Sequence, residues 1–271
     1  MKTLLCAVSH GLYPPWIEIL KNGQEKTWIS EPIPTNIEVL HYHATPVSPT
    51  FQKLDKIHEK IRWSSRYMHR LQSLLDTLIL FPLYGYVPKA EISEMLVVNP
   101  KAIHISFPDT YLTFRWKFLG LLQYFINSTT HDFLLTTTSS SYINLQVLST
   151  NISSLRSENL YYGAQPYEGA DFISGSNRII SRDIALKILA MKRHWPSGTI
   201  EDVAVGQLLA KAGITPNFIP LNNIETLEEL NAKTDVFLRQ NYHYRVKAGT
   251  NFERGDVEIM KALHTRLTSK Q

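Results

Sequence analysis

The sequence is poor in the features that mark secreted and membrane-spanning proteins. Its 271 residues include one cysteine, Cys6, which excludes an intramolecular disulfide and a cysteine-based zinc site. No stretch approaches the roughly 18 apolar residues from which a membrane-spanning helix is recognised. The apolar run from Leu4 to Val8 is too short for the core of a secretion signal and is interpreted as a buried strand. We therefore expect a cytoplasmic protein.

Several ligand-binding signatures are also missing. The net charge is +4, but there is no dense run of lysine and arginine, so nucleic acid is not an expected partner. No G-x-G-x-x-G or P-loop pattern follows an expected strand, which disfavours a dinucleotide or P-loop site. A G-x-S-x-G elbow for a serine nucleophile is missing as well.

The composition fits a single α/β domain, because 44% of the residues are apolar. Short apolar runs alternate with segments of helical periodicity, which predicts a Rossmann-like mixed central sheet flanked by helices. Strands are expected at residues 3–9, 36–42, 94–98, 102–106, 133–136, 171–174 and 217–220. Helices are expected at residues 55–81, at 113–126, after Ser181 as N-cap, from Glu201 to a terminating Gly213, and at 256–267.

Two acidic residues, Glu201 and Asp202, open one of the expected helices. The ordinary interpretation is that they complement the helix dipole. The functional interpretation is a general base, because a carboxylate held at the start of a rigid helix can take a proton from a hydroxyl. The residues alone leave both open.

Basic and small residues form three further candidate groups. Ser174, Gly175 and Arg178 follow an expected strand, where a glycine would let backbone N–H groups approach a phosphate or a sugar. Arg115 and Lys117 lie near the start of an expected helix. They are either ordinary cations that extend to solvent or the cations that bind a diphosphate. Alternation along a strand would place three basic side chains on one face of it. These are His243, Arg245 and Lys247. That face is either exposed to solvent or forms a clamp for an anion.

A run of six hydroxyl residues, 136–141, directly follows the apolar segment Phe133 to Leu135. It is either a Ser/Thr-rich turn or a strand end that faces a ligand. Trp195, shortly before Glu201, could stack on a sugar or pack in the core.

Read in chain order, these segments resemble the β-1,3-galactosyltransferase and Fringe-like glycosyltransferases, which have the GT-A fold. The resemblance covers residues 100–215, with fainter support at 1–30. The family patterns R-x-T-W, D-S-Y-x-N-L-x-x-K, F-L-L-K-T-D-D-D-x-F-x-N, Y-x-S-G-x-G-Y-x-x-S-R-D and E-D-V-x-V-G resemble residues 26–28, 109–117, 133–144, 172–183 and 201–206, respectively.

The resemblance implies a hexosyl- or pentosyltransferase that moves a sugar from a nucleotide-sugar donor, with UDP as the expected nucleotide. It implies a glycan acceptor and inversion at the anomeric carbon. It implies Asp202 as the base beside Glu201, and Trp195 on the acceptor side. It divides a single domain, 1–271, into a nucleotide-binding half at about 1–145 and an acceptor half at about 146–271. Val8, Ser9 and His10 follow the first strand, where such folds hold base and ribose.

The sequence departs from the family at its metal motif. The three family aspartates fall on Thr138, Ser139 and Ser140, and hydroxyls are poor ligands for a hard cation. We therefore expect no divalent metal, and a diphosphate neutralised by Lys117, Arg115, Arg178, His243, Arg245 or Lys247. Two alternatives remain open: a non-catalytic binder of nucleotide sugars or glycans, and a metal-dependent enzyme with other ligands.

Overall fold

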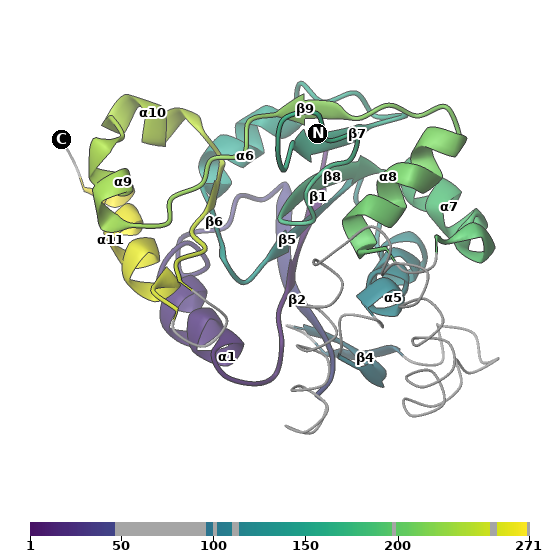
Figure 1. The fold of residues 1–271 in the computed structure, drawn as a ribbon, viewed down its shortest axis with the longest axis horizontal. Helices are drawn as coiled ribbons and strands as arrows, with labels where there is room; N and C mark the ends of the chain where they lie inside the picture. The colour runs from purple at the N-terminus through teal and green to yellow at the C-terminus, as the bar shows by residue number, and fades with distance from the viewer. Residues whose placement is uncertain (47–95, 100–101, 110–113, 197–198, 250–253, 270–271) are drawn as a thin grey trace, which may run out of the picture.

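The computed structural model describes residues 1–46, 96–99, 102–109, 114–196, 199–249 and 254–269 (Figure 1). The helix expected at residues 55–81 lies outside this part of the chain. The described strands form an eight-stranded mixed sheet in the order β3-β4-β2-β1-β5-β8-β7-β9 and a two-stranded sheet, β10-β6. Their bounds are β1 Leu4–Ser9, β2 Ile37–Thr45, β3 Leu96–Asn99, β4 Ala102–Pro108, β5 Phe133–Thr138, β6 Ser141–Ile143, β7 Tyr161–Ala164, β8 Asn177–Ser181, β9 Asn217–Ile219 and β10 His243–Arg245.

Helices cover both faces of the large sheet. They are α1 Trp16–Glu18, η1 Ile19–Gly23, η2 Gln24–Lys26, α5 Phe114–Ser128, α6 Leu145–Ile152, α7 Arg182–Ala190, η5 Lys192–His194, α8 Glu201–Lys211, α9 Leu227–Ala232, α10 Asp235–Gln240 and α11 Asp256–Thr268. In Figure 1, α5, α7 and α8 lie on the right and α9 to α11 on the left, with the strands between them. The chain is thus a mixed α/β protein with a central, mostly parallel sheet.

Each face of the sheet has its own apolar core. On one face, Phe118 and Phe125 of α5 pack with Ile184 of α7 and Leu209 of α8. On the other face, residues of α6, η1 and α11 pack against β1 and β5. Strand β1 is buried along its whole length, because its side chains point alternately into the two cores. Burial on both faces explains why β1 and the start of β5 read as continuous apolar runs.

The order of the parallel strands defines where a ligand would bind. Strand β1 pairs in parallel with β2 on one side and with β5 on the other, and β2 pairs in parallel with β4. After β1 the chain adds β2 and β4 on one side of it, and it then returns to add β5 on the other side. In open α/β sheets, ligands bind outside the carboxyl ends of the strands at such a switch point. Here those ends are Ser9 and Thr138.

Most of the expected elements are confirmed, with three differences. Residues 171–174 are not a strand; the sheet instead uses β7 and β8 on either side of them. Strand β5 continues through the hydroxyl residues to Thr138, and Ser141 opens β6. Ser181 does stand at the N-cap of α7, but its hydroxyl donates to the Asp183 carboxylate instead of capping a backbone N–H.

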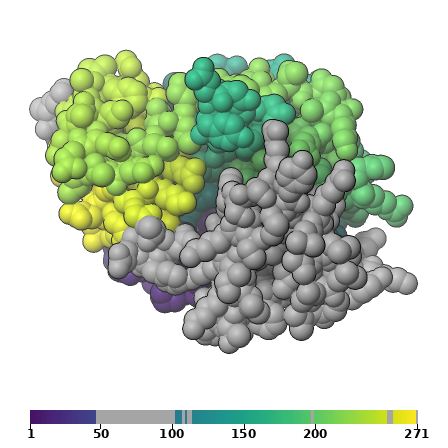
Figure 2. Space-filling view, viewed as in Figure 1, coloured from purple at the N-terminus to yellow at the C-terminus, as the bar shows by residue number. Residues whose placement is uncertain are grey.

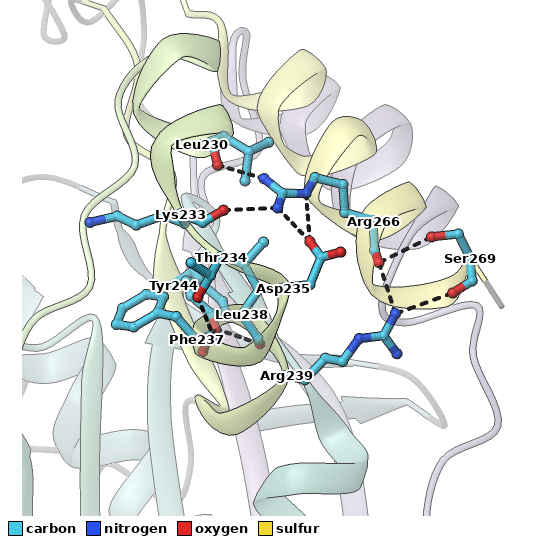
Figure 3. Close-up of polar contacts among 10 residues, drawn as sticks. All are labelled: Leu230, Lys233, Thr234, Asp235, Phe237, Leu238, Arg239, Tyr244, Arg266 and Ser269. Atoms are coloured by element: carbon cyan, nitrogen blue, oxygen red, sulfur yellow. Dashed lines mark hydrogen bonds and ion pairs between the residues drawn. The ribbon is translucent and has the colours of Figure 1, made fainter. Parts of the chain in front are cut away.

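The last three helices form a flank beside the sheet, seen at the left of the space-filling view (Figure 2). Arg266 of α11 fastens this flank together, as Figure 3 shows. Its guanidinium donates to the carbonyls of Leu230 (2.6 Å) and Lys233 (2.9 Å) and pairs with the Asp235 carboxylate. The carbonyls at the end of α9 are thereby satisfied by a cation, which is also the charge that the helix dipole favours there.

Candidate functional site

The ends of β1 and β5 meet at the switch point. Ser9 lies opposite Thr138 in the parallel register, and the backbone N–H of Ser139 donates to the Ser9 carbonyl at 3.0 Å. Ser9, His10, Ser139 and Ser140 are buried, whereas Thr138 is half-buried. Val8 is fully buried in the core, so its contribution is to support the strand end rather than to offer a polar group.

The hydroxyl run is tied to the neighbouring segment before β8. Thr137 Oγ1 donates to the Ser176 carbonyl at 2.8 Å, and Ser141 Oγ lies 3.4 Å from the same oxygen. Gln24 donates to the carbonyls of Thr138 and Ser141 at 3.1 and 3.2 Å. The run is therefore a braced strand end that continues into a turn at Ser139 and Ser140.

Strand β10 brings the predicted basic segment to the hydroxyl run. Arg245 lies opposite Ser141 in the antiparallel register, and the Val246 N–H donates to the Ser140 carbonyl at 2.8 Å. His243 is buried, and its Nε2 lies 3.2 Å from Ser141 Oγ. Burial lowers the pKa of His243 to about 3, so this side chain is neutral near pH 7. His243 is therefore placed to supply a hydrogen bond to the hydroxyl run rather than a positive charge.

Arg254 also reaches the hydroxyl run, and the sequence analysis did not include it. Its Nη2 donates to Ser140 Oγ at 2.7 Å. The same guanidinium pairs with the buried carboxylate of Asp256 and lies over the ring of Trp16, 4.9 Å from the centroid. In sequence, an arginine two residues before a helix-opening aspartate looks like an exposed cap pair. Only the tertiary return of α11 toward Ser140 reveals the contact.

A second charged group stands at the start of α8. The buried guanidinium of Arg178, on β8, donates to Glu201 Oε1 at 2.6 Å and lies 4.3 Å from the Phe118 ring centroid. Burial opposes the charge of Arg178, but the Glu201 carboxylate together with Tyr161 and Tyr42 outweighs burial, so the pKa of the guanidinium is raised. Arg178 is therefore a permanent cation whose charge is already matched within the protein.

Asp202 lies beside this pair and faces the loop before β8. Its Oδ1 accepts from the Val203 N–H at 2.9 Å, and its Oδ2 lies 3.4 Å from the Gly175 nitrogen. Burial raises the pKa of Asp202, while Arg178 and the backbone N–H groups oppose the rise. A held carboxylate with a raised pKa is a stronger base than an exposed aspartate, which suits proton abstraction.

The two groups lie at one edge of the sheet. Strand β8 runs antiparallel to β5, with Asn177 opposite Thr137. The loop that carries Ser174 and Gly175 therefore enters β8 next to the carboxyl end of β5. Ser174 is buried and its hydroxyl shares a 2.8 Å hydrogen bond with Ser176. Asp202 and the hydroxyl run consequently border the same end of the central strands.

Lys117 is drawn into the structure at the end of β1. Its buried ammonium donates to the His10 carbonyl at 2.9 Å and lies 3.4 Å from both carboxylate oxygens of Asp109. Burial lowers the pKa of Lys117, and Asp109 opposes that shift. The three N–H donors of the ammonium thus already have acceptors. Lys117 therefore stabilises the end of β1, where the sequence predicted a cation for the diphosphate.

His10 belongs to a row of imidazoles across the strand ends. Its ring centroid lies 5.3 Å from that of His41 and 5.1 Å from that of His43, and His43 lies 5.0 Å from His104. Burial lowers the pKa of His10 to about 3 and those of His41 and His43 to about 4. These three side chains are therefore neutral near pH 7.

Four further predicted residues have other surroundings. Trp195 is half-buried and packs against the core formed by α5, α7 and α8, so core packing accounts for it. Arg115 lies over the Trp116 ring at 4.7 Å, and burial lowers its pKa. Lys247 is exposed beyond the end of β10, and Arg245 is half-buried within it.

The donor set does not fit a tightly held divalent cation. Within the described ranges, no group of three His, Cys, Asp or Glu side chains is arranged so that it could hold a metal ion. At Thr138 to Ser140 the available ligands are neutral hydroxyls, two of which already bond protein groups. Hard divalent cations prefer several carboxylate oxygens.

Comparisons with known proteins give weak similarities in overall structure. The apo form of the glycosyltransferase GlyE from Streptococcus pneumoniae TIGR4 aligns with a TM-score of 0.43 and 11% identity, over 97% of this chain and 60% of that chain. A glycosyltransferase involved in the glycosylation of the major capsid of PBCV-1 gives 0.43 and 11%, over 96% of this chain and 99% of that chain.

A third similar structure is 4-diphosphocytidyl-2C-methyl-D-erythritol synthase from Anaerococcus prevotii DSM 20548, with a TM-score of 0.41 and 11% identity, over 81% of this chain and 87% of that chain. This chain thus spans less than two thirds of GlyE. No protein-family model matches the chain, and no curated protein matches it either. TM-scores below 0.5 do not establish a function. Within the described residues, no helix is long and apolar enough to cross a membrane.

Proposed function

We propose that the chain is a glycosyltransferase that moves a sugar from a nucleotide-sugar donor to a hydroxyl of a glycan acceptor. The observation that carries the proposal is the position of Asp202. Its carboxylate is held at the start of a helix, has a raised pKa, and borders the switch point where α/β sheets bind ligands. A base and a nucleotide-binding edge are the two parts that sugar transfer requires.

The proposed reaction is a single displacement with inversion. Asp202 takes the proton of the acceptor hydroxyl while that oxygen forms a bond to the anomeric carbon of the donor sugar. On the opposite side of the carbon, the bond to the diphosphate oxygen breaks, and the nucleoside diphosphate leaves with the electron pair. Glu201 does not act on the acceptor in this scheme; it pairs with Arg178 and so fixes the start of α8.

Donor binding is proposed at the carboxyl ends of β1 and β5. The polar groups there are Ser9, His10 and the hydroxyls from Thr138 to Ser140, with Ser174 and Gly175 on the neighbouring loop. We propose that the diphosphate is held without a divalent metal, since hydroxyl and cationic side chains can neutralise a leaving group electrostatically. UDP is the first nucleotide to test, in keeping with the Fringe-like motif resemblance.

A non-catalytic nucleotide-sugar or glycan binder is the second candidate. The observation that favours it is the replacement of the family's aspartates by Thr138, Ser139 and Ser140. The two functions differ in turnover, because a binder retains the donor but releases no nucleoside diphosphate.

Release of nucleoside diphosphate from UDP- and GDP-sugars, measured with a panel of glycan acceptors in EDTA, tests the proposal. We expect release that persists in EDTA and falls by at least ~100-fold in Asp202→Asn, which is the usual contribution of a general base. Donor binding should be retained in that variant. Donor binding without turnover across the panel would favour the binder, and loss of turnover in EDTA with rescue by manganese would favour a metal-dependent enzyme.

A further inference from the structure

We propose that Arg254 is the cation that binds the diphosphate at the hydroxyl run, an inference that rests on the proposed nucleotide-sugar function. Arg254 lies between two segments that meet at the switch point. Ser140, which accepts from its Nη2, directly follows β5. The guanidinium of Arg254 also lies over the ring of Trp16, which follows the loop after β1. Trp16 packs closely against that loop, because a Cβ on Gly11 would be 2.9 Å from its ring.

The guanidinium is held rigidly by its aspartate. Asp256 accepts from Arg254 Nε at 2.8 Å and from Nη2 at 2.5 Å, so one whole edge of the planar group is bound to the carboxylate. Asp256 itself is fixed, because it is fully buried and also accepts from the Ala248 N–H at 3.1 Å. This arrangement fixes the direction in which the rest of the guanidinium points.

The opposite corner of the guanidinium is unused. Arg254 Nη1 is buried and has no hydrogen-bond partner among the residues that the structure describes. Buried N–H groups in proteins almost always have an acceptor, and the best acceptor for a guanidinium N–H is an anionic oxygen. The geometry therefore fits a phosphate oxygen at Nη1, beside the Ser140 hydroxyl.

Three of the cations that the sequence predicts are less suited to this task. The ammonium of Lys117 already has three acceptors, and His243 is buried and neutral. Arg178 Nε and Nη1 are also buried without a partner among the described residues, but this guanidinium lies over the Phe118 ring and is paired with Glu201. Arg254 alone among these contacts a hydroxyl that replaces one of the family's aspartates.

Binding measurements on the full chain in EDTA test this assignment. The probes are UDP, GDP and inorganic diphosphate, with uridine and guanosine as uncharged references. One variant is Arg254→Lys. The second is Arg254→Gln combined with Asp256→Asn, which avoids leaving a buried aspartate without its partner. The control is Arg266→Lys, an arginine of α11 that is paired with Asp235 on the far flank.

We expect both Arg254 variants to bind diphosphates roughly 10- to 100-fold more weakly, the range for one charged hydrogen bond, with nucleoside binding unchanged. The Arg266→Lys control should bind like the wild type. Cooperative thermal unfolding confirms that each variant is folded. Unchanged diphosphate affinity in folded Arg254 variants overturns the assignment and leaves the proposed function standing. An equal loss for nucleoside and diphosphate also overturns it, and a wild type that binds none of the probes overturns both proposals.

Discussion

At the scale of single residues, the site is governed by a few buried charges. Asp202 has a pKa raised by burial and held back by Arg178, and Arg178 is in turn matched by Glu201 at 2.6 Å. Removing one partner of such a buried pair typically costs about 3–5 kcal/mol of stability, because the other charge stays behind unpaired. Both members must therefore be changed together when their effect on Asp202 is measured.

We predict that Arg178→Met combined with Glu201→Gln shifts the acid limb of the pH–rate profile to higher pH. The base works only when it is deprotonated, so turnover falls as the pH drops through the pKa of Asp202. The variant removes the guanidinium, which lowers that pKa, and also the Glu201 carboxylate, which acts in the opposite sense. Arg178 has the larger effect on Asp202, so protonation begins at a higher pH. The measurement is kcat/KM against pH.

Arg182→Met is the control for that experiment. Arg182 also lies over an aromatic ring, at 5.0 Å from the Phe125 centroid, but its guanidinium bonds to backbone carbonyls. Its loss should reduce stability and leave the acid limb where it was. A double variant with the wild-type profile would show that Asp202 is not the titrating base.

At the scale of elements, the loop before β8 depends on a close approach to α8. A Cβ on Gly206 would stand 2.5 Å from the Cβ of Phe172 and 3.2 Å from its Cα. Phe172 precedes the Ser174–Gly175 pair, so this glycine determines how near the loop lies to Asp202. The pattern E-D-V-A-V-G therefore contains both the proposed base, Asp202, and the glycine against which the neighbouring loop packs.

Gly206→Ala is expected to lower turnover by displacing this loop, even though alanine favours the helix. Gly213→Ala is the matched comparison. Gly213 has a φ of 72° and nothing within 4 Å of an added Cβ, so its replacement should cost about 1 kcal/mol of stability through strain and leave turnover intact. Equal turnover in the two variants would show that the packing of Gly206 against Phe172 does not matter for activity. Thermal unfolding and initial rates decide the matter.

The elements also show what the sequence can and cannot reveal. Strands β1 and β5 are predictable because burial on both faces produces apolar runs. Strands β2 and β4 are predictable because buried residues alternate with more exposed ones along them. The expected strand at 171–174 is wrong because Phe172 and Ile173 are buried from a loop. Strand β8 escapes notice because it contains Arg178, whose partner Glu201 is 23 residues away. Arg254 escapes for the same reason, since Ser140 is 114 residues away.

At the scale of the whole molecule, the C-terminal flank completes the switch point. The sheet supplies the strand ends Ser9 and Thr138, and β8 with α8 supplies Asp202. The segment from β10 to α11 then returns to the hydroxyl run, with Val246 bonded to the Ser140 carbonyl and Arg254 to its hydroxyl. Chain segments far apart in sequence thus converge on residues 138–141.

The central claim is that this edge of the sheet binds a nucleoside diphosphate without a divalent metal. Isothermal titration of the full chain with UDP and GDP, in EDTA and then with added manganese, tests it most directly. The account predicts saturable binding of at least one of the two in EDTA, with an affinity that manganese leaves essentially unchanged. Binding that appears only with manganese, or no binding of either nucleotide, would contradict it.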